Sequence, residues 1–181
     1  MSEEIFSAKT SLIFGGARSG KSYRAEQIVE RHGQNNAQLR KVYMATAECH
    51  DEEMAARIKM HRERRDQSWV TIDVPLTLDI QIASEVKVND IVLVDCLTMW
   101  LSNIMHAKLE IADELDKLIA AISVSPATLV FVSNELGHGI VPNNALAREF
   151  RDVHGLLNQR VASVVDHVEF VAAGLPLQLK P

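Results

Sequence analysis

Short apolar runs alternate along this chain with longer segments in which apolar positions recur at helical spacing. Runs such as Ile91 to Val94 contain no polar residue, which is typical of strands covered on both faces of a sheet. The runs that predict strands are 11–14, 41–45, 70–74, 91–94, 128–132 and 168–172. The segments that predict helices are 22–31, 51–65, 97–106, 113–122 and 145–165, the last with a break indicated at Gly155.

Strands that alternate with helices are typical of βαβ units with right-handed crossovers. A chain of 181 residues is the usual size of one domain, and no internal repeat or Pro/Gly-rich linker divides it. We therefore predict a single α/β domain over residues 1–181, with a mostly parallel central sheet flanked by helices in three layers.

Composition excludes several classes of protein. A formal net charge of −5 is a poor electrostatic footprint for binding duplex nucleic acid. Cys49 and Cys96 form no C-x-x-C pair, so they fit neither a zinc site nor a disulfide framework, and we expect free thiols. No apolar stretch approaches the roughly 20 residues of a membrane span. The acidic N-terminus lacks the apolar region of a secretory signal, so we expect a cytoplasmic protein.

One motif carries a specific chemistry. The pattern G-x-x-x-x-G-K-[ST] is matched without departure by Gly15, Gly16, Ala17, Arg18, Ser19, Gly20, Lys21 and Ser22. The motif follows an apolar run and opens a helical pattern, which is the context of a phosphate-binding loop (P-loop). The glycines let backbone N–H groups turn toward an anion, Lys21 reaches the β- and γ-phosphates, and the Ser22 hydroxyl ligates Mg²⁺. We predict a P-loop NTPase-like domain.

A P-loop enzyme also requires a carboxylate close to the metal, usually where a buried strand ends. Asp95 follows the apolar run Ile91 to Val94 and fits that place. A cap for the next helix is the alternative explanation, because Asp is a good N-cap residue. Asp73, at the end of another predicted strand, is a weaker candidate of the same kind.

The segment 51–65 gathers cationic side chains. On a helix, Arg57, His61, Arg64 and Arg65 share a face, which suits a polyphosphate. A neutral imidazole in that position could attack phosphorus as a nucleophile. The residues alone favour the plainer alternative, a solvated surface histidine on a charged helix.

Asn134 and Glu135 follow the run 128–132, at the carboxyl end of a predicted strand, where ligands of open parallel sheets bind. The glycines at 137 and 139 and Pro142 indicate a shaped loop after them. A turn with polar caps explains these residues equally well.

Taken together, these blocks resemble one family, the bifunctional adenosylcobinamide kinase / adenosylcobinamide-phosphate guanylyltransferases of cobalamin biosynthesis. The matching blocks are GGARSGKS at 15–22, YMATA at 43–47, DEEMAARI at 51–58 with His61, SNELGHGIVP at 133–142, and then Arg148, 150–152, Gly155 and 158–159. The resemblance runs over about residues 11 to 180 in the same order, and this combination is much more specific than a P-loop alone.

The resemblance implies that His61 takes GMP from GTP as a covalent phosphoramidate. It further implies nucleotide contacts outside the P-loop at Ala45, Thr46, Ala47, Arg62, Glu63, Arg64, Arg65, Asp73 and Asp95. The implied substrates are adenosylcobinamide, its phosphate, GTP and ATP, with Mg²⁺ held by Ser22 and Asp95. Members of the family resemble ring-forming homo-oligomers, commonly trimers.

The resulting hypothesis is a bifunctional enzyme that phosphorylates adenosylcobinamide and then transfers GMP to the product. A monofunctional P-loop kinase, with His61 idle, is the alternative. A GTP-dependent switch is disfavoured because the guanine-reading N-K-x-D motif is absent.

Overall fold

The computed structural model describes residues 8–36, 38–48 and 65–181. Its strands are β1 (Thr10–Gly15), β2 (Arg40–Ala45), β3 (Trp69–Asp73), β4 (Asp90–Asp95), β5 (Thr128–Asn134), β6 (His167–Ala172) and β7 (Leu175–Lys180). Its helical segments are α1 (Lys21–Asn35), α3 (Leu78–Ile80), the π-helical turn η2 (Gln81–Glu85), α4 (Leu97–His106), α5 (Ile111–Val124) and α6 (Ala145–Val164).

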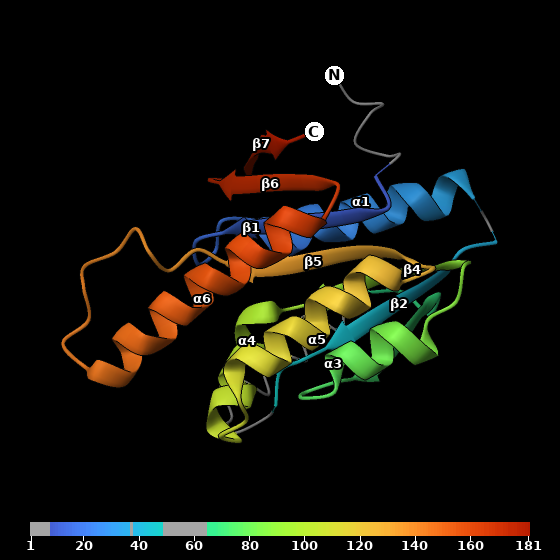
Figure 1. The fold of residues 1–181 in the computed structure, drawn as a ribbon. Helices are drawn as coiled ribbons and strands as arrows, with labels where there is room; N and C mark the ends of the chain where they lie inside the picture. Colours follow the sequence, from blue (N-terminus) through green and yellow to red (C-terminus); the bar gives the residue numbers. More distant parts are fainter. Residues whose placement is uncertain (1–7, 37, 49–64) are drawn as a thin grey trace.

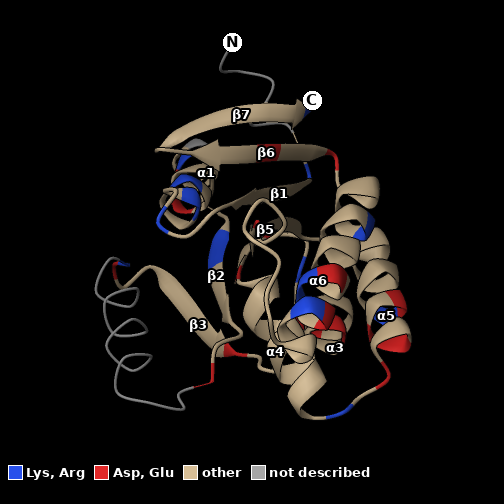
Figure 2. Ribbon diagram, turned by 90° about the vertical axis from the view of Figure 1, so that its left-hand side faces the viewer, with Lys and Arg blue, Asp and Glu red and all other residues tan. Residues whose placement is uncertain are grey.

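The strands form one sheet in the order β3-β2-β4-β5-β1-β6-β7. Every neighbouring pair is parallel except β6 and β7, which are antiparallel. Helix α1 covers one face, and α3, α4, α5 and α6 cover the other (Figures 1 and 2). The three-layer α/β architecture expected from the sequence is confirmed.

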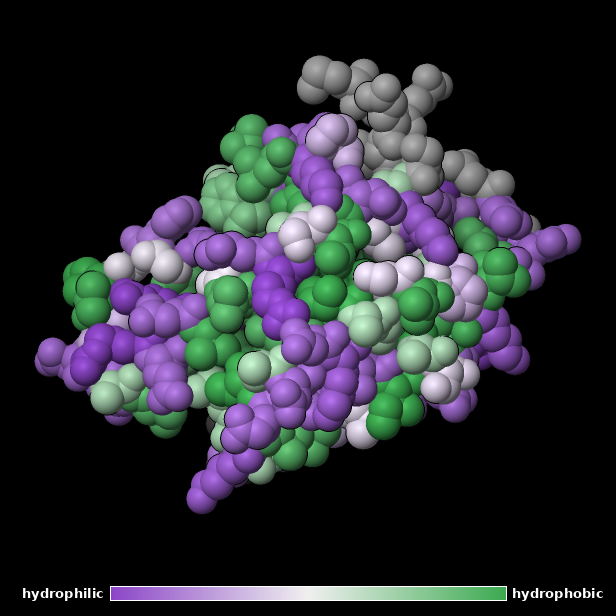
Figure 3. All heavy atoms as spheres, viewed as in Figure 1, coloured by the Kyte–Doolittle hydropathy of each residue, from purple (hydrophilic) through white to green (hydrophobic). Residues whose placement is uncertain are grey.

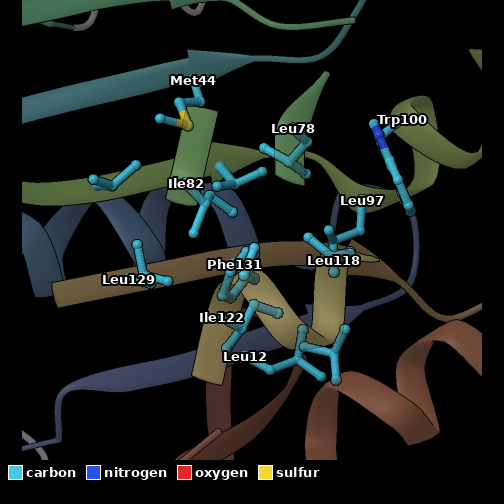
Figure 4. Packing of buried hydrophobic residues seen from close by; sticks show 14 of the residues in the cluster. Leu12, Met44, Leu78, Ile82, Leu97, Trp100, Leu118, Ile122, Leu129 and Phe131 are labelled. Carbon is cyan, nitrogen blue, oxygen red and sulfur yellow. The ribbon is translucent and has the colours of Figure 1, made fainter. Parts of the chain in front are cut away.

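Two buried apolar clusters hold the layers together, one on each face of the sheet. Ile13 and Leu93 pack with Ile28 of α1, whereas Leu12 and Phe131 pack with α4 and α5 on the opposite face. Figure 4 shows the second cluster from close by. Adjacent strand residues alternate between the two clusters because successive side chains of a strand point to opposite faces. Because both faces are covered, the middles of the central strands β4 and β5 consist of apolar residues alone.

The structure differs from the prediction in three places, and nearly all of the predicted helix 51–65 lies outside the described residues. The helical segment formed by α3 and η2 was not predicted. Helix α6 runs without a break through Gly155, which was expected to interrupt it. A helical glycine costs only about 1 kcal/mol relative to alanine, and the buried residues Leu157 and Val161 anchor the helix beyond it. Strand β7 was not predicted. It pairs with β6 through a turn in which Ala173 and Gly174 both have positive φ angles of 51° and 79°.

The face of the molecule in Figure 3 mixes hydrophilic and hydrophobic residues. Among the described residues, no helix is both long enough and apolar enough to cross a membrane.

Candidate functional site

The P-loop connects β1 to α1 at the carboxyl edge of the sheet. Arg18 and Gly20 have positive φ angles of 56° and 96°, so the chain reverses direction there before α1 begins at Lys21. The Lys21 Nζ donates a hydrogen bond to the Gly16 carbonyl at 3.1 Å. Burial lowers the pKa of Lys21, although Cys96 and Asp95 nearby oppose that shift. The loop, the helix N-terminus and a cation therefore surround one point, which is the arrangement that binds phosphates.

The turn between β6 and β7 supports the P-loop from behind. The Gly174 N–H donates to the Ser19 carbonyl at 2.8 Å. A Cβ on Gly20 would lie 3.2 Å from the Gly174 Cα, and a Cβ on Gly15 would lie 2.3 Å from the Val171 carbonyl oxygen. Gly15 is thus required by close backbone approach, because no real Cβ tolerates such a distance.

We expect Gly15→Ala to lower the free energy of unfolding by about 1–3 kcal/mol, the usual cost of overpacking. Gly16→Ala is the matched control, because a Cβ there would meet nothing within 4 Å. Urea unfolding of the two variants makes the comparison, with the control expected within about 0.5 kcal/mol of the parent protein. Equal stability of both variants would contradict the packing argument.

Asp95 ends β4 and lies beside Ala45, the last residue of β2. The Tyr43 hydroxyl donates to Asp95 Oδ2 at 3.1 Å. Burial and the neighbouring Asp95 both raise the pKa of Tyr43, which therefore stays protonated and able to donate. Asp95 is also close enough to Lys21 to influence its pKa. The structure thus brings the predicted metal carboxylate and the P-loop lysine into one electrostatic environment.

Thr46 is fully buried just after β2, and its hydroxyl is already occupied. It donates to the Cys96 carbonyl at 2.7 Å and accepts from the Cys96 N–H at 2.8 Å. Asn103 donates its amide to the Thr46 carbonyl at 2.7 Å. Burial raises the pKa of the Cys96 thiol to about 11, so that thiol stays protonated and unreactive. These bonds fix the segment of Ala45, Thr46 and Ala47 against the start of α4.

Asp73 lies at the same carboxyl edge, whereas Arg65 precedes the start of β3 and reaches Tyr43 of β2 with its side chain. The Arg65 guanidinium stacks over the Tyr43 ring, 3.4 Å from its centroid. Asp73, the last residue of β3, lies beside Ala45 in the parallel register. An open pocket of about 410 Å³ is lined by Arg65, Asp73 and the residues Asp66, Trp69 and Thr71.

The structure therefore places most of the predicted site residues along one edge. The residues that share it are 15–22, Ala45, Thr46, Ala47, Asp73 and Asp95, whereas Arg65 precedes β3 and contacts Tyr43. His61, Arg62, Glu63 and Arg64 lie outside the described residues.

Mg²⁺ fits the groups at this edge. In the described part of the chain, no three His, Cys, Asp or Glu side chains gather to hold a metal ion by themselves. Mg²⁺ does not require such a cage, because it is usually bound by one or two protein oxygens together with substrate phosphates and water. The Ser22 hydroxyl, at the start of α1, and the Asp95 carboxylate supply oxygens of that kind.

Comparison with known proteins identifies the family. A model of the CobU family, described as cobinamide kinase / cobinamide phosphate guanyltransferase, matches residues 11–179. The chain belongs to this family. The bifunctional adenosylcobalamin biosynthesis protein CobP of Pseudomonas aeruginosa is 40% identical over 171 residues, covering 93% of this chain and 96% of the relative. The protein CobU of Salmonella typhimurium is 39% identical over 184 residues, covering 93% and 98%.

Membership of the CobU family establishes a cobinamide kinase and cobinamide-phosphate guanylyltransferase of adenosylcobalamin biosynthesis. A similar fold occurs in a solved structure of low sequence identity. The crystal structure of the flagellar accessory protein FlaH from Methanocaldococcus jannaschii superimposes with a TM-score of 0.52 at 11% identity. The match covers 94% of this chain and 77% of FlaH, and it shows a shared fold alone.

A buried polar network behind β5 of this CobU-family chain was missed by the sequence analysis. His154 of α6 is 1% exposed. Its Nε2 lies 2.9 Å from the Thr98 hydroxyl and 3.3 Å from the Ser133 hydroxyl. Ser133 also donates to Asn158 Oδ1 at 2.6 Å. The histidine had no ligand-like spacing, and only the fold brings α4, β5 and α6 together around it.

We expect His154 to make stability depend on pH. Burial lowers its pKa from 6.5 to about 4, so between these values the unfolded chain binds a proton that the folded chain does not. The free energy of unfolding should therefore fall as the pH drops from 6.5 toward 4, by roughly 3 kcal/mol at most. Urea unfolding at pH 7, 5.5 and 4.5 measures this slope. His154→Gln should flatten it, and an unchanged slope in that variant would contradict the assignment.

Proposed function

We propose that this CobU-family enzyme carries out its two reactions in succession at the carboxyl edge of the sheet, beside the P-loop. In the first reaction, a nucleoside triphosphate bound on the P-loop gives its γ-phosphate to the aminopropanol hydroxyl of adenosylcobinamide. The hydroxyl oxygen forms a bond to the γ-phosphorus and its proton passes to solvent. The bond from that phosphorus to the bridging oxygen breaks with its electron pair on the departing diphosphate. Lys21 offsets the negative charge that spreads over the transferred group.

The observation that carries this proposal is the proximity of Lys21 to Asp95 beside a complete P-loop. Ser22 and Asp95 would hold Mg²⁺, which supplies charge neutralisation at the phosphates when bound. Asp95 is itself oriented by Tyr43, so its carboxylate is positioned before the nucleotide arrives.

In the second reaction, we propose that neutral His61 attacks the α-phosphorus of GTP. A nitrogen–phosphorus bond forms and pyrophosphate leaves with the electron pair of the broken bond. The phosphate of adenosylcobinamide phosphate then attacks the same phosphorus and releases the histidine. A covalent intermediate divides one encounter between two anions into two easier steps.

Several cationic groups would offset the charge in the second reaction. The cationic groups are Arg65, whose guanidinium stacks over Tyr43, and Arg62 and Arg64, which precede it in the sequence. Glu63, between them, would contact the nucleotide. Ala45, Thr46, Ala47 and Asp73 would contact the guanine nucleotide from the ends of β2 and β3. We further propose that the chain works as a homo-oligomer, as a trimer in keeping with the family resemblance.

The test is to incubate the purified protein with Mg²⁺ and GTP labelled at the α-phosphate, denature it and look for retained label. We expect label that is lost in acid and stable in alkali, as a phosphoramidate is. A parallel incubation with adenosylcobinamide and γ-labelled triphosphate should give a labelled corrinoid. Labelled corrinoid without labelled protein would favour the monofunctional kinase instead.

A further inference from the structure

Asn134 occupies a central position at the carboxyl edge of the sheet. Strand β5 lies between β1, which leads into the P-loop, and β4, which ends at Asp95 (Figure 1). Asn134 is the last residue of β5 and lies directly beside Gly15 in the parallel register. The next N–H, that of Glu135, donates to the Gly15 carbonyl at 2.9 Å. The end of β5 is therefore bonded to the first residue of the P-loop.

The side chain of Asn134 belongs to the same face of the sheet as Lys21 and Asp95. Val130 and Val132 of β5 pack in the cluster on the α1 face, so Asn134, two residues further, points to that face as well. The same alternation places Asp95 on the α1 face, after Leu93, where Tyr43 contacts it. Ser133 points to the opposite face and reaches His154.

Two side chains hold the backbone of Asn134 in place. Its N–H donates to the Thr98 hydroxyl at 3.0 Å, and its carbonyl accepts from the Asn158 amide at 2.9 Å. Thr98 and Asn158 are in turn bonded to His154 and Ser133, the buried network described above. In contrast, the side-chain amide of Asn134 makes no hydrogen bond with any described residue.

A fixed backbone that presents an unpaired amide is the arrangement expected of a preorganised donor. Such donors accelerate a reaction when they point to the place where negative charge develops, because no reorganisation is then needed. Between the P-loop and Asp95, that charge is on the transferred phosphoryl group of a bound triphosphate. The α-phosphate is a less suitable acceptor for the Asn134 amide. The helix N-terminus and the loop backbone already lie next to the phosphates that precede the γ-phosphate.

We propose that Asn134 is a catalytic residue of the kinase reaction, whose amide donates a hydrogen bond to the γ-phosphate. Thr98, Asn158 and His154 are its positioning residues. This inference rests on the proposed function, because it assumes that a triphosphate occupies the P-loop. The amide donates without losing its proton, so the bonds made and broken are those given above for the first reaction. Nothing in the sequence pattern alone distinguishes this amide from an ordinary strand-end cap.

The proposal is tested by comparing the affinity for triphosphate and diphosphate in the Asn134→Ala variant. The probes are the β,γ-imido analogues of ATP and GTP, set against ADP and GDP, measured by calorimetry. A hydrogen bond to a charged group is lost only with the triphosphates, so we expect their affinity to fall roughly 10- to 100-fold. The diphosphate affinity of the variant should stay within about twofold of the parent value, because a diphosphate has no γ-phosphate for the amide to bind. A twofold change is small compared with the loss of one hydrogen bond. Turnover of adenosylcobinamide should fall roughly 10²-fold.

Further variants make the result decisive. Asn89→Ala is the matched control, because Asn89 is exposed at the opposite edge of the sheet, before β4. Thr98→Val releases the backbone of Asn134 but keeps its amide, so it should show a smaller loss with the same preference for diphosphate. Asn134→Asp preserves the shape and gives the answer if the alanine variant does not fold. It should weaken triphosphate binding more strongly than alanine does.

Equal losses for triphosphate and diphosphate, or no loss in either Asn134 variant, would overturn the proposal. These binding measurements do not depend on turnover. A parent protein that binds nucleotide but never phosphorylates adenosylcobinamide would therefore contradict the proposed function. The contact between Asn134 and the γ-phosphate would then be judged from the binding measurements alone.

Discussion

Replacing His61 with alanine is expected to abolish the retention of labelled GMP on the protein altogether. The imidazole is the group proposed to form the bond to the α-phosphorus of GTP, and alanine offers no nucleophile in its place. Formation of adenosylcobinamide-GDP should fall below detection with it. The measurement is the acid-labile, alkali-stable label left on the denatured protein after incubation with α-labelled GTP and Mg²⁺.

The same variant should still phosphorylate adenosylcobinamide, because the P-loop and Asp95 are untouched. His106→Ala serves as the control, since His106 is an exposed histidine at the end of α4. It should label like the parent protein. Equal label in the His61→Ala variant and the parent protein would remove His61 from the mechanism, because another residue would then carry the GMP.

Replacing Lys21 with methionine should lower the rate of adenosylcobinamide phosphorylation by about 10³-fold. Losses of this size are typical when a single cation or preorganised donor at the transferred phosphoryl group is removed. Methionine retains much of the length and apolar volume of the lysine stem but removes the charge. The half-buried Lys21 is held over the loop by its bond to the Gly16 carbonyl, so its ammonium is already directed at the phosphates. Transfer of label from γ-labelled ATP or GTP to the corrinoid provides the measurement.

Lys9→Met is the matched control for that experiment. Lys9 is exposed just before β1, at the opposite edge of the sheet from the P-loop, and its loss should leave the rate unchanged. The unfolding free energy of both variants should be compared, so that a loss of rate is not confused with a loss of fold. A Lys21 variant that keeps more than a tenth of the parent rate would contradict its role.

The part of the site that the sequence predicted is local along the chain. The P-loop needs consecutive residues with particular backbone freedom, and the continuous segment from Gly15 to Ser22 supplies them. Asp95 could be placed because a run of apolar residues marks a buried strand and the residue after it must reach the carboxyl edge. The Lys21–Asp95 pair thus followed from two local patterns and one general property of parallel sheets.

Other parts of the site depend on residues far apart in sequence. The turn at Gly174 contacts Ser19, Arg65 lies over Tyr43, and Thr98 bonds to both His154 and Asn134. None of these pairs shares a spacing that a helix or strand would reveal. Strand β7 was missed for the same reason, since its outward-facing leucines have no pattern of a covered strand and its place is set by pairing with β6.

The sequence by itself determined the fold class, the P-loop and the likeness to the CobU family, because each depends on residue patterns within short segments of the chain. Only the tertiary structure decided which strand lies between the P-loop and Asp95, and therefore that Asn134 reaches the space between them. The physical reason is that strand order and helix packing minimise the exposure of apolar side chains over the whole domain, whereas a hydrogen bond such as that from Asn134 to Thr98 exists only after that packing is complete.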